Sequence, residues 1–381
     1  MSPKQKNIEY LCDLLDLIIK NSPDVKNINP AHGKSGISIF SFLASKLLKK
    51  TKYEEFSNML LKDYFDEICN NYRFLHSLDM INALLIVNNL AQMKFVEIER
   101  MSDLFCLTPP KISMNYPFHM NQTNYYFSLY LVKKNLYKPN NNINIQEQIL
   151  FILISIDALY IDMETQYSLP DRIYIYQGYL ENVDQICLSL FFLGELGKMD
   201  FCQKYSSKLS QKLISNLEYI LNEIKNIINL NKIEWKSNSY LTIFSLLTKC
   251  CSCLLKINKN LSTQLFEYIK SSLLYFCEND TSYFLFLNDN MSLLIQNRLQ
   301  ILKNMHFINN IINNDIIRQY LFSQSDYLIF ALKEGNVLYE TYSDKDGSLN
   351  HGTKGLSGIG LVLLSIYYNL PNDMLWFNDL I

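Results

Sequence analysis

The fold is decided near the end of the sequence, where the chain reads Asn350-His351-Gly352-Thr353-Lys354-Gly355-Leu356-Ser357-Gly358-Ile359-Gly360-Leu361-Val362-Leu363-Leu364. Glycine makes up only 11 of the 381 residues, yet four glycines lie within nine positions of this stretch. Glycine is costly inside a helix, and it is retained where two backbones approach closely or where φ is positive. The stretch therefore predicts a tight turn that runs directly into an apolar helix.

A second copy of this pattern lies near the other end of the chain, where the sequence reads His32-Gly33-Lys34-Ser35-Gly36-Ile37-Ser38-Ile39-Phe40. Both copies have His-Gly, a spacer, Ser-Gly-Ile and then an apolar helix. The spacer is one residue long in the first copy and four residues long in the last. A unit that recurs at both ends of a chain predicts an architecture built from repeats.

The chain between these copies has the pattern of an all-helical protein, because apolar residues recur at spacings of three and four and short alternating runs are scarce. A helix that is apolar nearly all round must be buried on both sides, whereas an amphipathic helix keeps a solvated face. Seven ranges belong to the first class: Gly36–Leu48, Leu78–Leu90, Gln148–Tyr160, Val183–Leu196, Leu241–Leu255, Met291–Leu302 and Gly358–Tyr368. Amphipathic helices lie between them, for example Tyr53–Ile68, Cys202–Ile224 and Leu261–Cys277.

The alternation of buried and amphipathic helices predicts the fold class, which we expect to be an all-α, α/α toroid of about seven inner and seven outer helices. The steps between successive buried helices average about 54 residues, slightly longer than the common helical repeats. An open solenoid is the alternative, but it needs capping repeats with a polar outer face, and neither end of the sequence has one. We expect a single domain over residues 1–381, with residues 1–30 as an N-terminal helical lead-in.

Composition limits the classes of function and the compartment. Apolar residues make up 49% of the chain and the net charge is −2, so the sequence gives no electrostatic reason to expect nucleic acid. No run of about 18 apolar residues indicates a membrane span. The nine cysteines are scattered over apolar helical faces, and the first residues do not have the pattern of a secretory signal. We therefore expect reduced core thiols and a cytoplasmic protein.

The glycine turns, the sevenfold helix count and the length together resemble the lanthionine synthetase C-like family. The resemblance is closest from Leu349 to Leu364 and from Ala31 to Leu43. It implies an α/α toroid with a zinc ion held at its mouth by two cysteines and one histidine. In the family's cyclases this zinc activates a peptide cysteine, which adds to a dehydrated serine or threonine and closes a thioether ring. A zinc-bound thiol is deprotonated, so a nucleophile exists at neutral pH.

The sequence departs from the family at the positions that the resemblance assigns to the metal. Lys236, within Trp235-Lys236-Ser237-Asn238, stands where the first zinc cysteine is expected. Asn288 and Asp289 replace the Cys-His pair before the sixth inner helix, and no adjacent Cys-His pair exists elsewhere in the chain. Lysine, asparagine and aspartate cannot form the nitrogen and sulfur site that zinc prefers. Gln177, just before the fourth buried helix, stands at the position of the family's acid/base histidine. We therefore expect no zinc and no other cofactor.

Two further sets of residues are candidates. His32 and His351 precede glycine at the starts of inner helices, and with Asp289 they could line a peptide-binding mouth; the alternative is a histidine packed in a turn. Cys250, Cys251 and Cys253, with Cys277 and His306, could form a displaced zinc site, because Cys250 and Cys253 share a helical face. Free cysteine is among the most buried residue types, so core thiols are the simpler interpretation.

The leading hypothesis is a degenerate, zinc-less toroid that serves lanthipeptide-type modification by binding a precursor peptide or a partner modifying enzyme. The alternative is an active thioether-forming cyclase with a displaced or non-standard metal site, so the sequence leaves open whether the protein is an enzyme. Other α/α toroid enzymes, such as prenyltransferase-like, terpene-cyclase-like or glycosidase-like proteins, need metal ligands or paired carboxylates that the sequence does not supply.

Overall fold

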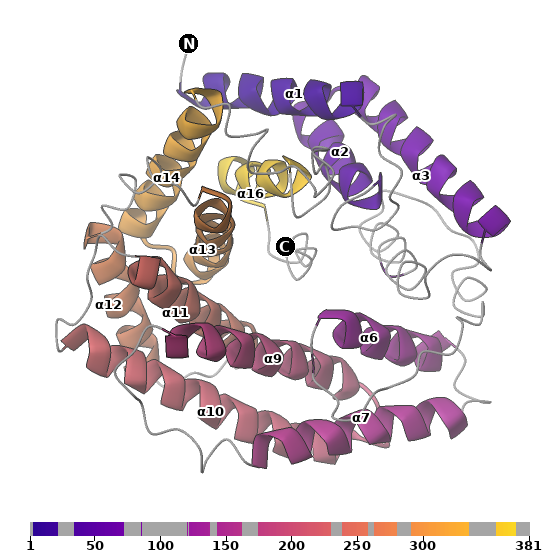
Figure 1. Ribbon diagram of the computed structural model, residues 1–381, viewed down its shortest axis with the longest axis vertical. Coiled ribbons are helices and arrows are strands. Elements are labelled where there is room, and N and C mark those ends of the chain that lie inside the picture. The colour runs from indigo at the N-terminus through magenta and orange to yellow at the C-terminus, as the bar shows by residue number, and fades with distance from the viewer. Residues whose placement is uncertain are drawn as a thin grey trace. The chain divides into compact units, whose positions relative to one another are not determined.

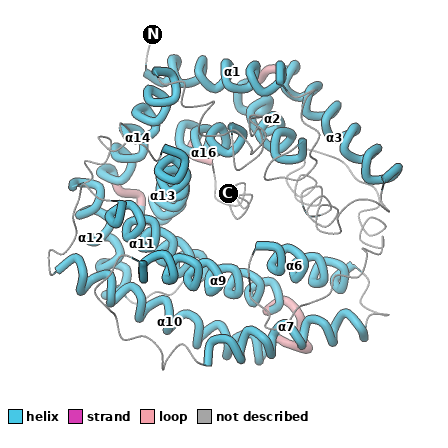
Figure 2. The backbone as a smooth tube through the Cα atoms, viewed as in Figure 1, coloured by secondary structure: helices cyan, strands magenta, loops and turns pink. Residues whose placement is uncertain are grey.

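The computed structural model describes residues 3–21, 34–71, 85, 120, 122–137, 143–161, 174–229, 238–257, 263–279, 291–334 and 356–370. Within these ranges all regular structure is helical and no strand occurs, as the cyan helices in Figure 2 show. The all-α expectation is therefore confirmed for the described part of the chain. Among the described helices, none combines the length and the apolar character that crossing a membrane needs.

The helices fall into two compact units, the first made of Met1–Glu97 with Leu273–Ile381 and the second of Ile98–Ser272. The first unit contains α1 (Pro3–Asn21), α2 (Lys34–Leu48), α3 (Thr51–Asn71), α13 (Met291–Ile312), α14 (Asp315–Glu334) and α16 (Leu356–Tyr368). The second unit contains α6 (Gln122–Tyr137), α7 (Ile143–Ile161), α9 (Tyr174–Leu196), α10 (Gln203–Asn229) and α11 (Asn238–Ile257). The boundary falls within α12 (Thr263–Asn279).

Helix α16 is the centre of the first unit. It contacts α1, α2, α13 and α14, which lie around it in Figure 1. Every residue from Leu356 to Tyr367 is buried. This agrees with the sequence-based expectation that a helix apolar nearly all round is buried on every side.

A glycine of the C-terminal motif sets the distance between α16 and α2. A Cβ atom placed on Gly360 would lie only 2.0 Å from Cζ of Phe40, so any larger residue would collide with the aromatic ring. Phe40 is itself fully buried and belongs to the N-terminal copy of the motif. The two copies at opposite ends of the sequence are therefore packed against each other, and Gly360 is retained because a ring occupies the space of a side chain.

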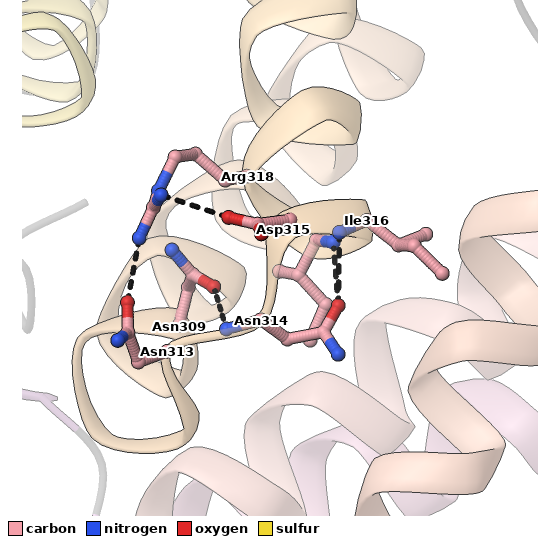
Figure 3. Close-up of polar contacts among 7 residues, drawn as sticks. Asn309, Asn313, Asn314, Asp315, Ile316 and Arg318 are labelled. Carbon is pink, nitrogen blue, oxygen red and sulfur yellow. Dashed lines mark hydrogen bonds and ion pairs between the residues drawn. The ribbon is translucent and has the colours of Figure 1, made fainter.

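The turn between α13 and α14 is held by asparagine side chains (Figure 3). Asn313 has a φ of 52°, a left-handed conformation that asparagine tolerates better than most residues. Asn314 caps α14, because its Oδ1 accepts hydrogen bonds from the backbone N–H groups of Ile316 at 2.9 Å and Ile317 at 3.2 Å. Its own N–H donates to Oδ1 of Asn309 at 3.1 Å. These bonds fix α14 beside α13 through a short connection.

Helix α9 is the corresponding centre of the second unit, where it contacts α6, α10 and α11. Charged side chains join it to two of these neighbours. Lys133 on α6 lies 3.4 Å from Glu195 on α9, and Lys249 on α11 pairs with Asp184 on α9. The pKa of Glu195 is lowered because the lysine partners outweigh burial, which alone would raise it.

Five of the seven predicted buried ranges coincide with α2, α9, α11, α13 and α16, and the range Leu78–Leu90 lies outside the described residues except for Leu85. The expectation that Gln148–Tyr160 is buried on all sides is wrong. It is helical, within α7, but it is not buried all round, because Leu150, Phe151 and Ile154 are 41%, 41% and 62% exposed.

Helix α6 is largely buried, in contrast to α7, although the sequence did not place α6 in the class of buried helices. Its side chains from Phe127 to Val132 are all buried. The burial of Ser128 is offset by a hydrogen bond from its Oγ to the backbone carbonyl of Asn124 at 2.6 Å. Serine and tyrosine made α6 look less apolar than α7, but satisfied hydrogen bonds allow such residues to be buried.

Candidate functional site

Most residues of the predicted site lie outside the described part of the chain. These are His32, Lys236, Asn288, Asp289 and His351. Gln177 falls within α9, which begins at Tyr174, although only its backbone is described. Gln177 therefore lies inside the fourth buried helix and not just before it, because that helix begins nine residues earlier than Val183.

Several described helices nevertheless begin within a few residues after these positions in the sequence. Helix α2 starts at Lys34, just after His32, and α11 starts at Asn238, just after Lys236. Helix α13 starts at Met291, two residues after Asp289. The first turn of a helix has unpaired N–H groups and a partial positive charge, which favour anionic or hydrogen-bond-accepting partners. The predicted site residues therefore precede helix N-termini, as the sequence pattern indicated.

The cysteine cluster of α11 has the properties of a core rather than of a metal site. Cys250, Cys251 and Cys253 are all buried. Burial raises the pKa of Cys250, and it also raises that of Cys251. In the metal-free chain, burial therefore favours the neutral thiol form of both groups. No group of three or more histidine, cysteine, aspartate or glutamate side chains that could hold a metal occurs among the described residues.

His306, the histidine offered for a displaced zinc site, has another partner. Its Nε2 lies 3.2 Å from the carbonyl oxygen of Leu370, just beyond the end of α16. A carbonyl oxygen can only accept, so this contact is a hydrogen bond in the tautomer that carries its proton on Nε2; Nδ2 of Asn310 also lies 3.3 Å from that nitrogen. Nδ2 of Asn310 donates to the same oxygen at 3.2 Å. Burial lowers the pKa of His306, so the neutral ring is the form that holds the end of α16 to α13.

Arg298 is a buried cation that the sequence analysis missed. It is the largest fully buried side chain among the described residues, and its Nη1 donates to the hydroxyl of Tyr320 on α14 at 3.0 Å. Its charge also opposes the rise in the pKa of Tyr327 that burial causes. The signal was present in the sequence, because Arg298 is the one charged residue in the apolar range Met291–Leu302. A charge inside a buried helix is retained only where polar partners meet it.

A polar cluster that the sequence analysis also missed joins α1 to the start of α3. Nζ of Lys50 donates to Sγ of Cys12 at 3.0 Å, and Nζ of Lys52 lies 2.7 Å from Oδ1 of Asp16. The Lys52 ammonium also lies 4.8 Å from the centre of the Tyr53 ring. Burial raises the pKa of Tyr53 above its usual value, and the neighbouring carboxylate of Asp16 raises it further. The phenol therefore stays protonated, and the cluster holds the two helices together.

Comparisons with known proteins supply no relative on which to base a function: no family model, no curated protein and no solved structure matches the chain.

Proposed function

We propose that this chain is a degenerate member of the lanthionine synthetase C-like family, folded as an α/α toroid without the family's zinc. In this proposal it takes part in lanthipeptide-type modification by binding a precursor peptide or the enzyme that modifies it. The scaffold is kept for binding while the chemistry of ring closure is lost.

The observation that carries the proposal is the packing of the two glycine motifs against each other. Helix α2 holds the first copy and α16 the last, and Phe40 fills the space above Gly360. In an open solenoid each repeat contacts only its neighbours in the sequence, so the first and last repeats stay apart. Contact between the end repeats supports a ring.

The absence of zinc is proposed from the residue types at the expected ligand positions. Lys236, Asn288 and Asp289 offer an ammonium, an amide and one carboxylate, which together suit zinc poorly. Core thiols are the interpretation that burial favours for the cysteine cluster of α11, because the side chains of Cys250 and Cys251 are fully buried. The alternative, an active cyclase with a displaced metal site, therefore has less support.

The experiment restores the family's ligands and measures bound metal. We expect the purified wild-type chain to hold no stoichiometric zinc. The triple variant Lys236→Cys/Asn288→Cys/Asp289→His should bind one zinc per chain, because these substitutions complete a Cys, Cys and His site at the family positions. A matched control moves the same three residue types one position along the chain, as Ser237→Cys/Asp289→Cys/Asn290→His, and should bind none.

Each outcome of this experiment bears on a separate part of the proposal. Stoichiometric zinc in the wild-type chain would overturn the zinc-less assignment and favour the cyclase alternative. That alternative is then tested by incubating the chain with a dehydrated, cysteine-containing precursor peptide and asking whether the peptide thiol becomes protected from alkylation. If the triple variant folds but binds no more zinc than its control, the resemblance at the predicted mouth is wrong.

A further inference from the structure

Among the described helices, α7 has the highest apolar content next to α16, yet one of its faces is exposed. Leu150, Phe151 and Ile154 are exposed, and their spacing puts them on one side of the helix. The opposite side is fully buried through Ile149, Ile152, Leu153 and Ile156. A contiguous exposed apolar patch often marks an interaction site, so this face is a candidate interaction surface.

The charges around this face are divided between two helices. Glu147 lies on the exposed face of α7, one turn before Leu150 and Phe151, and α7 contains no lysine or arginine. Asp157, near the other end of the face, accepts a hydrogen bond from the hydroxyl of Tyr205 at 2.8 Å and lies 3.6 Å from Nζ of Lys212. Both partners belong to α10, so α10 runs beside this end of α7.

Lys208 supplies an exposed positive charge at the same end. In α10, Lys208 comes three residues after Tyr205 and four residues before Lys212. All three side chains therefore project from the same side of that helix. One end of the apolar face is therefore acidic, at Glu147, and the other end is bordered by lysines.

We propose that a second copy of this chain covers the face, through antiparallel pairing of α7 with α7 about a twofold axis. Antiparallel pairing centred between Phe151 and Ile154 places each Phe151 opposite the second copy's Ile154. It also places each Glu147 opposite the second copy's Ala158, beside Asp157 and the lysines of α10. The face is thus complementary to itself in both apolar character and charge, as a twofold interface requires.

The proposed dimer is tested with the full-length chain by sedimentation equilibrium from dilute to concentrated protein. We expect a monomer–dimer equilibrium for the wild type. Ile154→Lys buries a charge in the centre of the interface and should weaken association by about 100-fold or more. Its matched control is Phe330→Lys on α14, which changes a side chain of similar exposure, 58% against 62%, and should leave association unchanged.

Charge reversal tests the antiparallel register itself. Glu147→Lys and Lys208→Glu should each weaken association by about tenfold, because the symmetric dimer contains the pair twice. The double variant Glu147→Lys/Lys208→Glu restores opposite charges across the interface and should associate nearly as well as the wild type. Circular dichroism of each variant establishes that the helices are intact.

Three results would overturn the proposal. The first is a wild-type chain that stays monomeric at every concentration, which would leave the face to a different partner. The second is a dimer that survives Ile154→Lys, because its interface would lie elsewhere. The third is a double variant, Glu147→Lys/Lys208→Glu, that associates no better than its single variants even though Ile154→Lys abolishes the dimer. The pairing of Glu147 with Lys208 would then be absent.

Discussion

Helices α16 and α7 are both apolar around most of their circumference, yet one is enclosed and the other is open. Every side chain from Leu356 to Tyr367 in α16 is buried, whereas α7 exposes Leu150, Phe151 and Ile154. One difference between them is the close approach that glycine allows on one side of α16. Helix α16 has Gly358 and Gly360, and a neighbouring ring occupies the space beside Gly360, while α7 has no glycine.

The apolar composition of a helix predicts how much of its surface favours burial. It does not predict which neighbouring element covers that surface. When another residue occupies the space that a side chain would need at a glycine, the glycine indicates close packing against that particular neighbour. Helix α7 has no glycine on its outer side, which is the side that the second copy covers in the proposed dimer. Substitutions in α7 and α16, and the titration of His306, test this difference between the two helices.

The largest effect is expected within α7 itself, where its two sides should respond differently to the same change. Ile156→Ala removes a fully buried side chain and should lower the free energy of unfolding by about 2–5 kcal/mol. Ile154→Ala, its matched control on the open side, should cost less than about 1 kcal/mol. Urea unfolding of dilute protein, where association contributes least, measures both. Equal losses would mean that the outer side of α7 is packed within a single chain.

The next effect concerns the packing of α16 against α2. Gly360→Ala puts a Cβ atom into the ring of Phe40 and should lower the free energy of unfolding by about 1–3 kcal/mol. The matched control is Gly194→Ala in α9, where nothing lies within 4 Å of an added Cβ atom. That substitution should raise stability by up to about 1 kcal/mol, because alanine favours a helix more than glycine does.

A smaller residue at position 40 sharpens this result. Phe40→Leu combined with Gly360→Ala should recover part of the stability that Gly360→Ala alone loses, because leucine leaves room for the added methyl group. If Gly360→Ala were as stable as the wild type, the close approach of α2 and α16 would be wrong, and the support for a closed ring would be lost with it.

The helical class and several helices were predictable from the sequence because helical periodicity and the glycine motifs are local signals, whereas the toroid stays a prediction. Helices α2 and α16 begin and end close to their expected bounds. The assignment of α7 as a helix buried on both sides failed, because composition does not reveal which face a neighbour covers. The burial of α6 was missed for the opposite reason, since hydrogen bonds such as that of Ser128 are invisible in a hydropathy pattern.

The candidate site was less predictable than the fold. Lys236, Asn288 and Asp289 were located only by resemblance to a family, and they lie outside the described residues. Arg298 carried a usable signal as a single charge in an apolar helix, but the contact between Lys50 and Cys12 carried none. That contact joins residues 38 positions apart, and nothing in either local sequence indicates that they meet.

The smallest effect is expected at the end of α16, where His306 donates to the carbonyl of Leu370. Burial lowers the pKa of His306 in the folded chain, whereas an unfolded histidine titrates near about 6.5. As the pH falls below that value the unfolded chain takes up more protons than the folded chain. The contribution of His306 to stability is therefore fully present above the pKa that this histidine has in the unfolded chain. It is lost as the pH falls toward the pKa of His306 in the folded chain.

Urea unfolding across this pH range should show the loss in the wild type and not in His306→Gln, whose side-chain amide can still donate to Leu370. The part of the slope that His306 contributes, taken as wild type minus His306→Gln, cannot exceed about 1.4 kcal/mol per pH unit, the limit set by one proton. His76→Gln, at a histidine elsewhere in the chain, is the matched control and should leave the contribution of His306 in place. If His306→Gln kept the full pH dependence, the neutral ring of His306 would not be what anchors the end of α16, and the enclosure of that helix would depend on its apolar contacts and Gly360 alone.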